Sequence, residues 1–296
     1  MSEKRCSFVA VVGQPNAGKS TLVNTVVGEK VSIVSHKIQT TRMQVRGIAA
    51  IGRNSQVVFI DTPGFCQSRT PLESVIAGNF KSSLNGVDLA LVLIDASAKY
   101  DESSLSILQL LQQKKINTVV VINKVDIAKK ENILRVASAL AGHTFLKKVF
   151  MISALTGDGI EDLKEFLAED APIGPWMYAP GQATDMTTTL RLAEITREKI
   201  FERMEKEIPY SIYVETELFK ETEKKARIYQ SIVVMKDSQK GIILGRNGLM
   251  IKEIKEASIA DMRNLLGKKI ELRLFVKVRT KWATSRIHLQ NAGIID

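Results

Sequence analysis

Residues 13–20 read Gly-Gln-Pro-Asn-Ala-Gly-Lys-Ser and fill every position of the phosphate-binding pattern G-x-x-x-x-G-K-[ST]. Backbone N–H groups of such a loop surround phosphates, and the N-terminus of the following helix adds a favourable dipole. In this pattern the Lys19 ammonium reaches the β- and γ-phosphates, and the Ser20 hydroxyl ligates Mg²⁺. The predicted phosphate site consists of Gly13, Gln14, Pro15, Asn16, Ala17, Gly18, Lys19, Ser20 and Thr21.

A second group of candidate residues surrounds the sequence Asp61-Thr-Pro-Gly64. An Asp at the carboxyl end of the preceding strand is placed to hold Mg²⁺ through water, and the Gly64 N–H is placed to bond a γ-phosphate. Thr41, with Thr40 as the second choice, lies where a loop that senses the γ-phosphate belongs. The predicted metal ligands are Ser20, Thr41 and Asp61, and the nucleotide site also includes Thr62, Pro63 and Gly64.

The sequence Asn123-Lys-Val-Asp126 carries residues that can select a base. The Asp126 carboxylate can accept hydrogen bonds from guanine N1–H and from the 2-amino group, whereas adenine offers neither donor. Discrimination can be large, because a buried carboxylate left unpaired is costly. A backbone N–H in Ile152-Ser-Ala154 is placed to meet guanine O6. The predicted base-binding residues are Asn123, Lys124, Val125, Asp126, Ser153 and Ala154.

Short apolar runs are placed to position these motifs. A strand-like run at 8–12 precedes the glycine loop, and a helical run follows it at 21–27. Further strand-like runs at 56–60, 118–122 and 148–151 lead into the other motifs. Any one motif is compatible with an ordinary turn. Their common order, each at the end of a strand, indicates one nucleotide site on a strand–helix scaffold.

Composition favours an intracellular chain with two domains. A length of 296 residues with 45% hydrophobic residues suits two domains of ordinary size. Cys6 and Cys66 have no metal-ligand spacing, which favours a reducing compartment. His36, His143 and His288 are scattered, so we expect no metal cluster. No apolar run approaches the roughly 20 residues that span a bilayer, and no signal or transit segment is recognisable; we expect a cytosolic, bacterial-type protein.

A boundary is indicated at Ala171–Gly181, which holds three prolines and two glycines and cannot form a helix interior. We predict a first domain over residues 1–170, a linker over 171–185 and a second domain over 186–296. Positive charge is concentrated late in the chain, because residues 236–296 hold 13 Lys or Arg and 6 Asp or Glu. A concentration of positive charge is compatible with an ordinary solvated surface. Among specific partners, nucleic acid is the leading candidate.

The second domain shows helical and strand-like patterns in a definite order. Helix, strand, strand, helix, helix and strand follow one another, and Gly245-Arg-Asn-Gly248 separates the two adjacent helices. This order resembles a type II KH domain, and the resemblance implies a GxxG loop that lets a sugar–phosphate backbone pass close to the protein and clamps about four unpaired nucleotides. GxxG alone is more commonly a plain helix–helix turn. The patterned ranges are 190–206, 210–218, 227–235, 242–254 and 269–278.

The first-domain motifs resemble, in order and residues, those of the translation-factor-like GTPases. Gln39-Thr-Thr-Arg42 and Asp61-Thr-Pro-Gly-Phe65 resemble the Era branch of that group. The order of elements in the second domain resembles a type II KH domain. Together the two domains resemble the Era GTPase family over essentially the whole chain.

This resemblance implies an α/β P-loop GTPase domain with a three-layer, mostly parallel sheet, followed by an α+β type II KH domain. It implies GTP and GDP with Mg²⁺ as ligands, slow hydrolysis of GTP, and a monomeric protein. It further implies binding to small-subunit (16S) rRNA near its 3′ end, action in assembly of the 30S ribosomal subunit, and peripheral association with the inner membrane. The RNA-binding residues are then Gly245, Arg246, Asn247, Gly248 and Lys252.

Phe65 stands where many regulatory GTPases carry a Gln that orients the attacking water. A phenyl ring cannot hydrogen-bond water, so either hydrolysis is negligible or charge stabilisation comes from elsewhere. Asn16 resembles the position that binds K⁺ in potassium-activated GTPases, and a monovalent cation beside the phosphates would supply positive charge. The predicted catalytic residues are Lys19, Asn16, Thr41 and Gly64.

Two other functions fit some of these features. An accessory GTPase of tRNA or protein modification would use the basic second domain as a generic docking surface. A purely structural RNA-binding protein would carry an inactive nucleotide site, but the intact Lys19, Ser20 and Asp61 argue against it. The KH-like order favours an rRNA-binding switch, and a preference for small-subunit rRNA over tRNA would distinguish it from the accessory GTPase.

Overall fold

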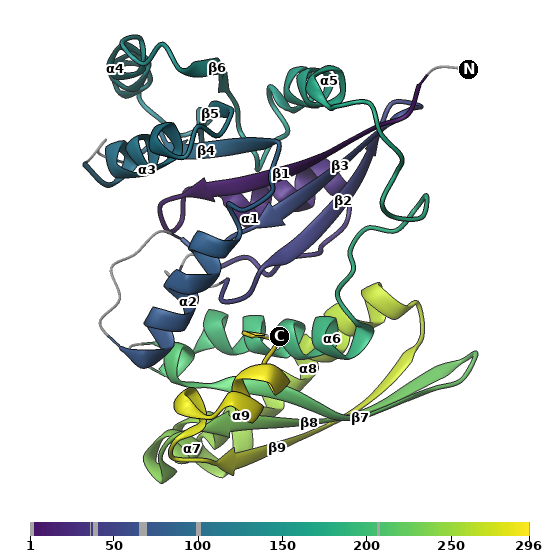
Figure 1. The fold of residues 1–296 in the computed structure, drawn as a ribbon. Coiled ribbons are helices and arrows are strands. Elements are labelled where there is room, and N and C mark those ends of the chain that lie inside the picture. Colours follow the sequence, from purple (N-terminus) through teal and green to yellow (C-terminus); the bar gives the residue numbers. More distant parts are fainter. Residues whose placement is uncertain are drawn as a thin grey trace. The chain divides into compact units, whose positions relative to one another are not determined.

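The computed structural model describes residues 3–35, 37, 41–64, 70–98, 102–205 and 208–295 (Figure 1). By its internal contacts the chain divides into two compact units, which we call the first and the second unit. The first comprises Met1–Arg69 and Ile76–Asp185, and the second comprises Thr70–Val75 and Met186–Asp296.

The sheet of the first unit has the strand order β2-β3-β1-β4-β5-β6. β2 runs antiparallel to β3, and all other neighbours in this sheet are parallel. The inner strands are almost continuous apolar runs, as expected for parallel strands covered on both faces. The strands are β1 (Arg5–Gly13), β2 (Val45–Ile51), β3 (Ser55–Asp61), β4 (Leu89–Asp95), β5 (Thr118–Asn123) and β6 (Leu146–Met151).

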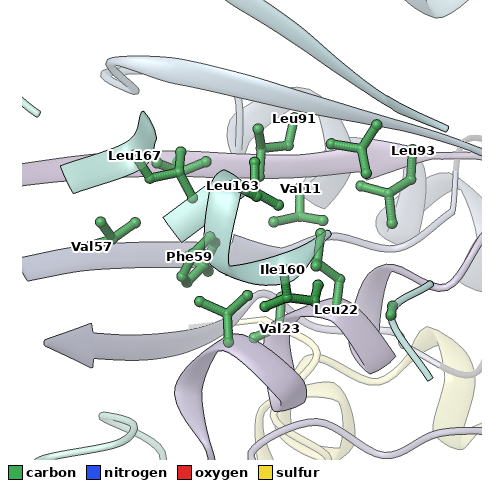
Figure 2. Close-up of a cluster of buried hydrophobic side chains, with 14 of the residues drawn as sticks. Val11, Leu22, Val23, Val57, Phe59, Leu91, Leu93, Ile160, Leu163 and Leu167 are labelled. Atoms are coloured by element: carbon green, nitrogen blue, oxygen red, sulfur yellow. The ribbon is translucent and has the colours of Figure 1, made fainter. Parts of the chain in front are cut away.

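Helices cover both faces of this sheet and complete the three layers expected from the sequence. Figure 2 shows the core on one face, where Leu22 of α1 and Leu163 of α5 share a cluster with Phe59 and Leu91 of the sheet. The cluster on the other face joins α2, α3 and α4 to β1, β4 and β5. The helices are α1 (Lys19–Val27), α2 (Pro71–Ser82), α3 (Glu102–Gln113), α4 (Lys130–Leu140) and α5 (Ile160–Asp170).

The segment predicted as a linker, residues 171–185, is bound to the first unit, and we call it the strap. The Gln56 side chain of β3 donates to Tyr178 O at 3.0 Å and accepts from the Tyr178 N–H at 3.1 Å. The Ile48 N–H of β2 donates to Ala183 O at 2.8 Å. The strap therefore runs along β3 and β2, the two strands that flank the predicted γ-phosphate-sensing loops.

The second unit has the chain order α6, β7, β8, α7, α8 and β9, which is the order predicted from the sequence. β8 pairs antiparallel with β7 and parallel with β9, and we call these three strands the small sheet. α6 and α8 lie along one of its faces (Figure 1). The elements are α6 (Thr188–Arg203), β7 (Tyr213–Glu221), β8 (Lys225–Val234), α7 (Asp237–Leu244), α8 (Leu249–Leu266) and β9 (Lys269–Val278).

One predicted boundary in the second unit was wrong. The strand expected from residue 210 begins only at Tyr213, because Ile208–Ser211 forms a 3₁₀ helix. Pro209 explains the difference, since its ring fixes φ and it has no N–H to donate to a strand partner.

The end of the chain folds back on the small sheet. The Trp282 ring lies 4.9 Å from the Tyr213 ring, measured between centroids, and Trp282 Nε1 donates to Ser211 O at 3.0 Å. Arg279 Nη1 donates to the Tyr213 hydroxyl at 3.1 Å. Burial is the main cause that raises the pKa of the Tyr213 hydroxyl to about 12. This segment, with α9 (Arg286–Asn291), covers the part of the sheet around Tyr213.

Candidate nucleotide site and GxxG loop

The glycine loop joins the end of β1 to the start of α1, as the sequence predicts. Gly18 precedes α1 with a φ of 95° and provides no side chain to cap the helix. A Cβ atom on Gly18 would lie 2.2 Å from Nδ2 of Asn123, so only glycine fits this position. The start of α1 therefore keeps its N–H groups uncapped by a side chain, which is the arrangement that binds anions.

Lys19 is the buried cation of this loop, with 7% of its surface exposed. Its Nζ donates to Gln14 O at 2.8 Å and to Gly13 O at 3.2 Å. The two carbonyl groups hold the ammonium at the loop before a phosphate arrives, so less side-chain freedom is lost on binding.

Three predicted metal ligands lie together, although they come from three separate segments. Ser20 Oγ donates to Asp61 Oδ2 at 2.7 Å and lies 3.1 Å from Thr41 Oγ1. Asp61 is fully buried, and Thr41 is 9% exposed. The structure thus brings one carboxylate and two hydroxyl groups to one point beside the start of α1.

The Asp61 carboxyl has one oxygen that the protein leaves unsatisfied. Asp61 Oδ1 is buried and has no hydrogen-bond partner in the described part of the chain. Burial raises the pKa of this carboxyl above its ordinary value, while the Ser20 hydroxyl and the Lys19 charge oppose that rise. An unpaired carboxylate oxygen beside two hydroxyls suits Mg²⁺, which binds oxygen ligands and completes its shell with water and phosphate. The residues present therefore fit a magnesium ion.

The segment after Asp61 runs directly beside the glycine loop. Thr62 Oγ1 donates to Val11 O at 2.8 Å, which fixes the exit from β3. A Cβ atom on Gly64 would lie 2.9 Å from Pro15 N. Pro63 is buried between these two positions. The backbone of Gly64 therefore lies where it can contact a phosphate held by the glycine loop.

Asn123 ties the base-selecting motif to the rest of the site. Its Nδ2 donates to Ala17 O at 2.8 Å, and its Oδ1 accepts from the Ala154 N–H at 2.9 Å. The Ser153 N–H donates to Asp158 O at 3.0 Å. The N–H groups of Ser153 and Ala154 thus both donate to other groups of the protein. The contact of this segment with guanine O6 stays a prediction.

The other residues of the base-selecting motif are oriented by partners that the sequence analysis missed. Lys124 Nζ forms an ion pair with Asp95 Oδ2 at 2.6 Å. Burial would raise the pKa of the Asp95 carboxyl, but hydrogen bonds from Lys124 and Ser97 hold it below its ordinary value. The Val125 N–H donates to Ile152 O at 3.2 Å, and Asp126 is exposed. Asp95 ends the apolar strand β4, a position that could have suggested it.

Some predicted positions lie outside the described residues. These are Thr40, the second choice for the metal ligand, and Phe65, the position of the missing Gln. Gln39, His36 and Cys66 also lie outside them.

The GxxG loop joins α7 to α8, as predicted. Asn247 has a φ of 51° and Gly248 a φ of 74°. A Cβ atom on Gly245 would lie 2.6 Å from the Met250 Cβ, so glycine is required there. Arg246, Asn247 and, within α8, Lys252 are exposed. The loop thus combines a bare backbone with two accessible cationic side chains.

Comparison with known families agrees with this division. The family model described as "50S ribosome-binding GTPase" matches residues 8–124, and the model described as "KH domain" matches residues 207–283. Apart from residues 70–75, the first match lies in the first unit, and the second match lies in the second unit. The two matches confirm the expected α/β GTPase domain followed by an α+β KH domain.

Similar proteins and structures cover nearly the whole chain. GTPase Era of Agrobacterium fabrum is 43% identical over 98% of this chain and 92% of its own length. GTPase Era of Rhizobium meliloti is also 43% identical, over 98% of this chain and 93% of its own. A structure of an Aquifex aeolicus Era variant bound to GDP and AlF₄⁻ matches with 32% identity and a TM-score of 0.93, covering 99% of this chain and all of that one.

A structure of Era in complex with MgGDPNP and nucleotides 1506–1542 of 16S ribosomal RNA matches with the same identity, TM-score and coverage. Both a GTPase domain and a KH domain are present here, and the similarity extends over both. This chain belongs to the Era family of GTPases.

Proposed function

We propose that this protein binds and hydrolyses GTP with Mg²⁺, binds small-subunit (16S) rRNA near its 3′ end, and acts in assembly of the 30S ribosomal subunit. The observation that carries the proposal is the presence in one chain of an assembled nucleotide site and an exposed GxxG loop. The relative solved with MgGDPNP and 16S rRNA nucleotides supports the same pair of ligands for this chain.

We assign the nucleotide contacts from the geometry of the first unit. Backbone N–H groups of the glycine loop and the Lys19 ammonium bind the phosphates, and Asp126 selects guanine. Ser20, Thr41 and Asp61 would hold Mg²⁺, which would neutralise charge on the phosphate oxygens. Gly64 lies beside the glycine loop, which supports a contact of its N–H with the γ-phosphate. Because Thr41 belongs to a loop that the γ-phosphate orders, its contact distinguishes GTP from GDP.

The RNA contact is tested by reversing charge at the GxxG loop. Arg246→Asp and Asn247→Asp place a carboxylate where the sugar–phosphate backbone passes. Asp tolerates the positive φ of residue 247, so this variant keeps the loop conformation. We expect each to weaken binding of a single-stranded 16S 3′-end RNA at least tenfold, about 1.4 kcal/mol or more, with GTP affinity unchanged.

Fluorescence anisotropy of the labelled RNA at fixed salt measures this effect. Arg286→Asp, which changes an exposed Arg on α9, is the matched control for total charge. RNA binding that is insensitive to both loop variants would refute the assignment. Equal binding of tRNA and 16S RNA would instead favour an accessory GTPase of tRNA modification.

We propose further that K⁺ contributes to hydrolysis through Asn16. Asn16 is exposed on the glycine loop and has a φ of 64°. A monovalent cation there would add positive charge beside the phosphates. Hydrolysis should be slow, because Phe65 stands where many regulatory GTPases carry a Gln that orients the attacking water. It should be faster in K⁺ than in Na⁺, because the bound cation supplies charge beside the phosphates. Asn16→Gly removes the side chain without straining the left-handed backbone, and should abolish the K⁺ preference while leaving GDP binding nearly intact. Equal rates of the wild-type protein in both salts would exclude this role.

The remaining features are proposed on the family relationship and, for the domain limits, on the proline- and glycine-rich segment Ala171–Gly181. They are a monomeric state, domain limits of 1–170 and 186–296 with a linker over 171–185, and a cytoplasmic location with peripheral association at the inner membrane. Over the residues that the structure describes, no helix has both the length and the apolar character needed to cross a membrane. Fractionation of cells into cytosol, washed membranes and ribosomes tests the location.

A further inference from the structure

The small sheet has a second face, opposite α6 and α8. The GxxG loop is not part of this face. Alternation along each strand turns residues such as Ile228 and Leu272 into the core under the helices. The residues between them point the other way and form what we call the outer face. Apart from the end at Tyr213, it consists of Glu215, Glu217, Leu218, Lys220, Lys225, Arg227, Tyr229, Ser231, Lys269, Glu271, Arg273, Phe275 and Lys277.

Two aromatic rings lie on adjacent strands of the outer face. Phe275 of β9 is 46% exposed, and every other phenylalanine among the described residues is buried or half-buried. Its register partner on β8 is the small Ser231, while Tyr229 pairs with Arg273. Tyr229 and Phe275 are thus diagonal neighbours, a spacing over which aromatic side chains interact. A three-stranded face with an exposed ring beside a second ring resembles the sheets that stack unpaired bases.

The charge of this face complements a polyanion. It holds six Lys or Arg side chains and three carboxylates. All three carboxylates are already paired: Glu271 binds Lys225 at 3.2 Å and Arg227 at 3.3 Å, Glu217 binds Lys277, and Glu215 binds Arg279 at 3.6 Å. The pairs of Glu217 and Glu271 also hold the pKa of these two carboxyl groups below their ordinary value. The face therefore stays positive.

Arg273 is the cation best placed to act together with the rings. Its guanidinium carbon lies 5.2 Å from the centroid of the Tyr229 ring. Among the described residues it forms no ion pair, and the same holds for Lys220 and Lys269 at the far end of the face. A planar cation over one ring and an open ring beside it can hold a base or a phosphate.

We propose that the outer face is a second contact surface for single-stranded RNA, in which a base stacks on Phe275 and Arg273 binds the adjoining base or phosphate. The proposal rests on the proposed RNA-binding function, because it extends the RNA beyond the nucleotides held at the GxxG loop. A protein partner is disfavoured by Arg273, a cation beside the ring that has no ion pair within the described part of the chain, since a protein interface leaves charged residues at its rim and not at its centre.

RNAs of two lengths distinguish binding at the GxxG loop from binding at the outer face. The GxxG loop clamps about four nucleotides, so a four-nucleotide RNA reaches only that loop, whereas a 20-nucleotide unstructured RNA can reach both. With the full-length protein, Phe275→Ala should weaken binding of the longer RNA about five- to tenfold, the size expected for loss of one stacked base. The same variant should leave the affinity for the four-nucleotide RNA unchanged. Arg273→Ala should give the same pattern.

Three further variants make the test decisive. Ile287→Ala, which trims another exposed apolar side chain of the second unit, should change neither affinity. Phe275→Trp keeps a stacking ring, and its added fluorescence should be quenched by the 20-nucleotide RNA and not by the four-nucleotide RNA. Arg246→Asp should weaken binding of both RNAs.

Unchanged affinity of Phe275→Ala for the 20-nucleotide RNA, with no quenching in Phe275→Trp, would overturn the outer-face proposal. A retained loss in Arg246→Asp would then show that the proposed function stands. Failure of Arg246→Asp to weaken either RNA would refute the GxxG contact instead.

Discussion

Asp126→Asn should convert a site for guanine nucleotides into one for xanthine nucleotides. The carboxylate of Asp126 is exposed in this structure. In the base contact that we propose, it accepts from guanine N1–H and from the 2-amino group. The amide that replaces it presents an N–H donor to the 2-amino group, which is itself a donor. The amide N–H and the 2-amino N–H are then both left without an acceptor. We expect GTP and GDP to bind more weakly by about 3 kcal/mol, and xanthosine triphosphate to bind more tightly than GTP because its 2-oxo group accepts from the amide.

Calorimetric titration with GDP and xanthosine diphosphate measures both changes without interference from hydrolysis. Asp158→Asn is the matched control, because Asp158 is an exposed carboxylate of the loop that follows β6. The isosteric change at residue 126 should leave the free energy of unfolding within about 0.5 kcal/mol of the wild-type value, as for surface substitutions generally. Equal GDP affinity of Asp126→Asn and the wild-type protein would show that another group selects the base.

The positions of the site residues were predictable because their chemistry depends on residue type and spacing at strand ends. Ser20, Thr41 and Asp61 are separated by up to 41 positions, yet they meet as expected. Ser20 follows β1 and Asp61 ends β3, and these parallel strands end at one edge of the sheet. Thr41 lies at the same edge because it precedes β2, which runs antiparallel to β3. The order of elements in the second unit was predictable for a similar reason. Alternating and helical periodicities there are long enough to separate strands from helices.

The contacts that orient these residues were not predictable. Asn123 uses its amide to hold Ala17 and Ala154, and Lys124 pairs with Asp95, but neither partner is marked by periodicity. Such contacts depend on strand register, which no local pattern gives. The strap is a further case. Its prolines and glycines indicate only the absence of a helix, and its attachment to β3 depends on the single buried side chain of Gln56.

Lys19→Ala should abolish nucleotide binding while the first unit remains folded. The buried ammonium bonds to Gln14 O and Gly13 O. Loss of these two bonds should lower the free energy of unfolding by about 1–2 kcal/mol. Loss of its charge-assisted bonds to two phosphates costs more, about 3 kcal/mol or greater, so GTP and GDP affinity should fall at least 100-fold.

Thermal unfolding separates these two effects. A ligand present at 100 times its Kd stabilises the folded protein by about 2.7 kcal/mol. GDP should therefore raise the Tm of the wild-type protein, whereas at the same concentration a variant with at least 100-fold weaker affinity gains about 0.4 kcal/mol or less. Lys114→Ala, which removes an exposed lysine of the same unit, should retain the full shift. A GDP-induced shift in Lys19→Ala equal to the wild-type shift would show that the phosphates are held without this ammonium. The backbone N–H groups at the start of α1 would then supply the binding energy that we assign to Lys19.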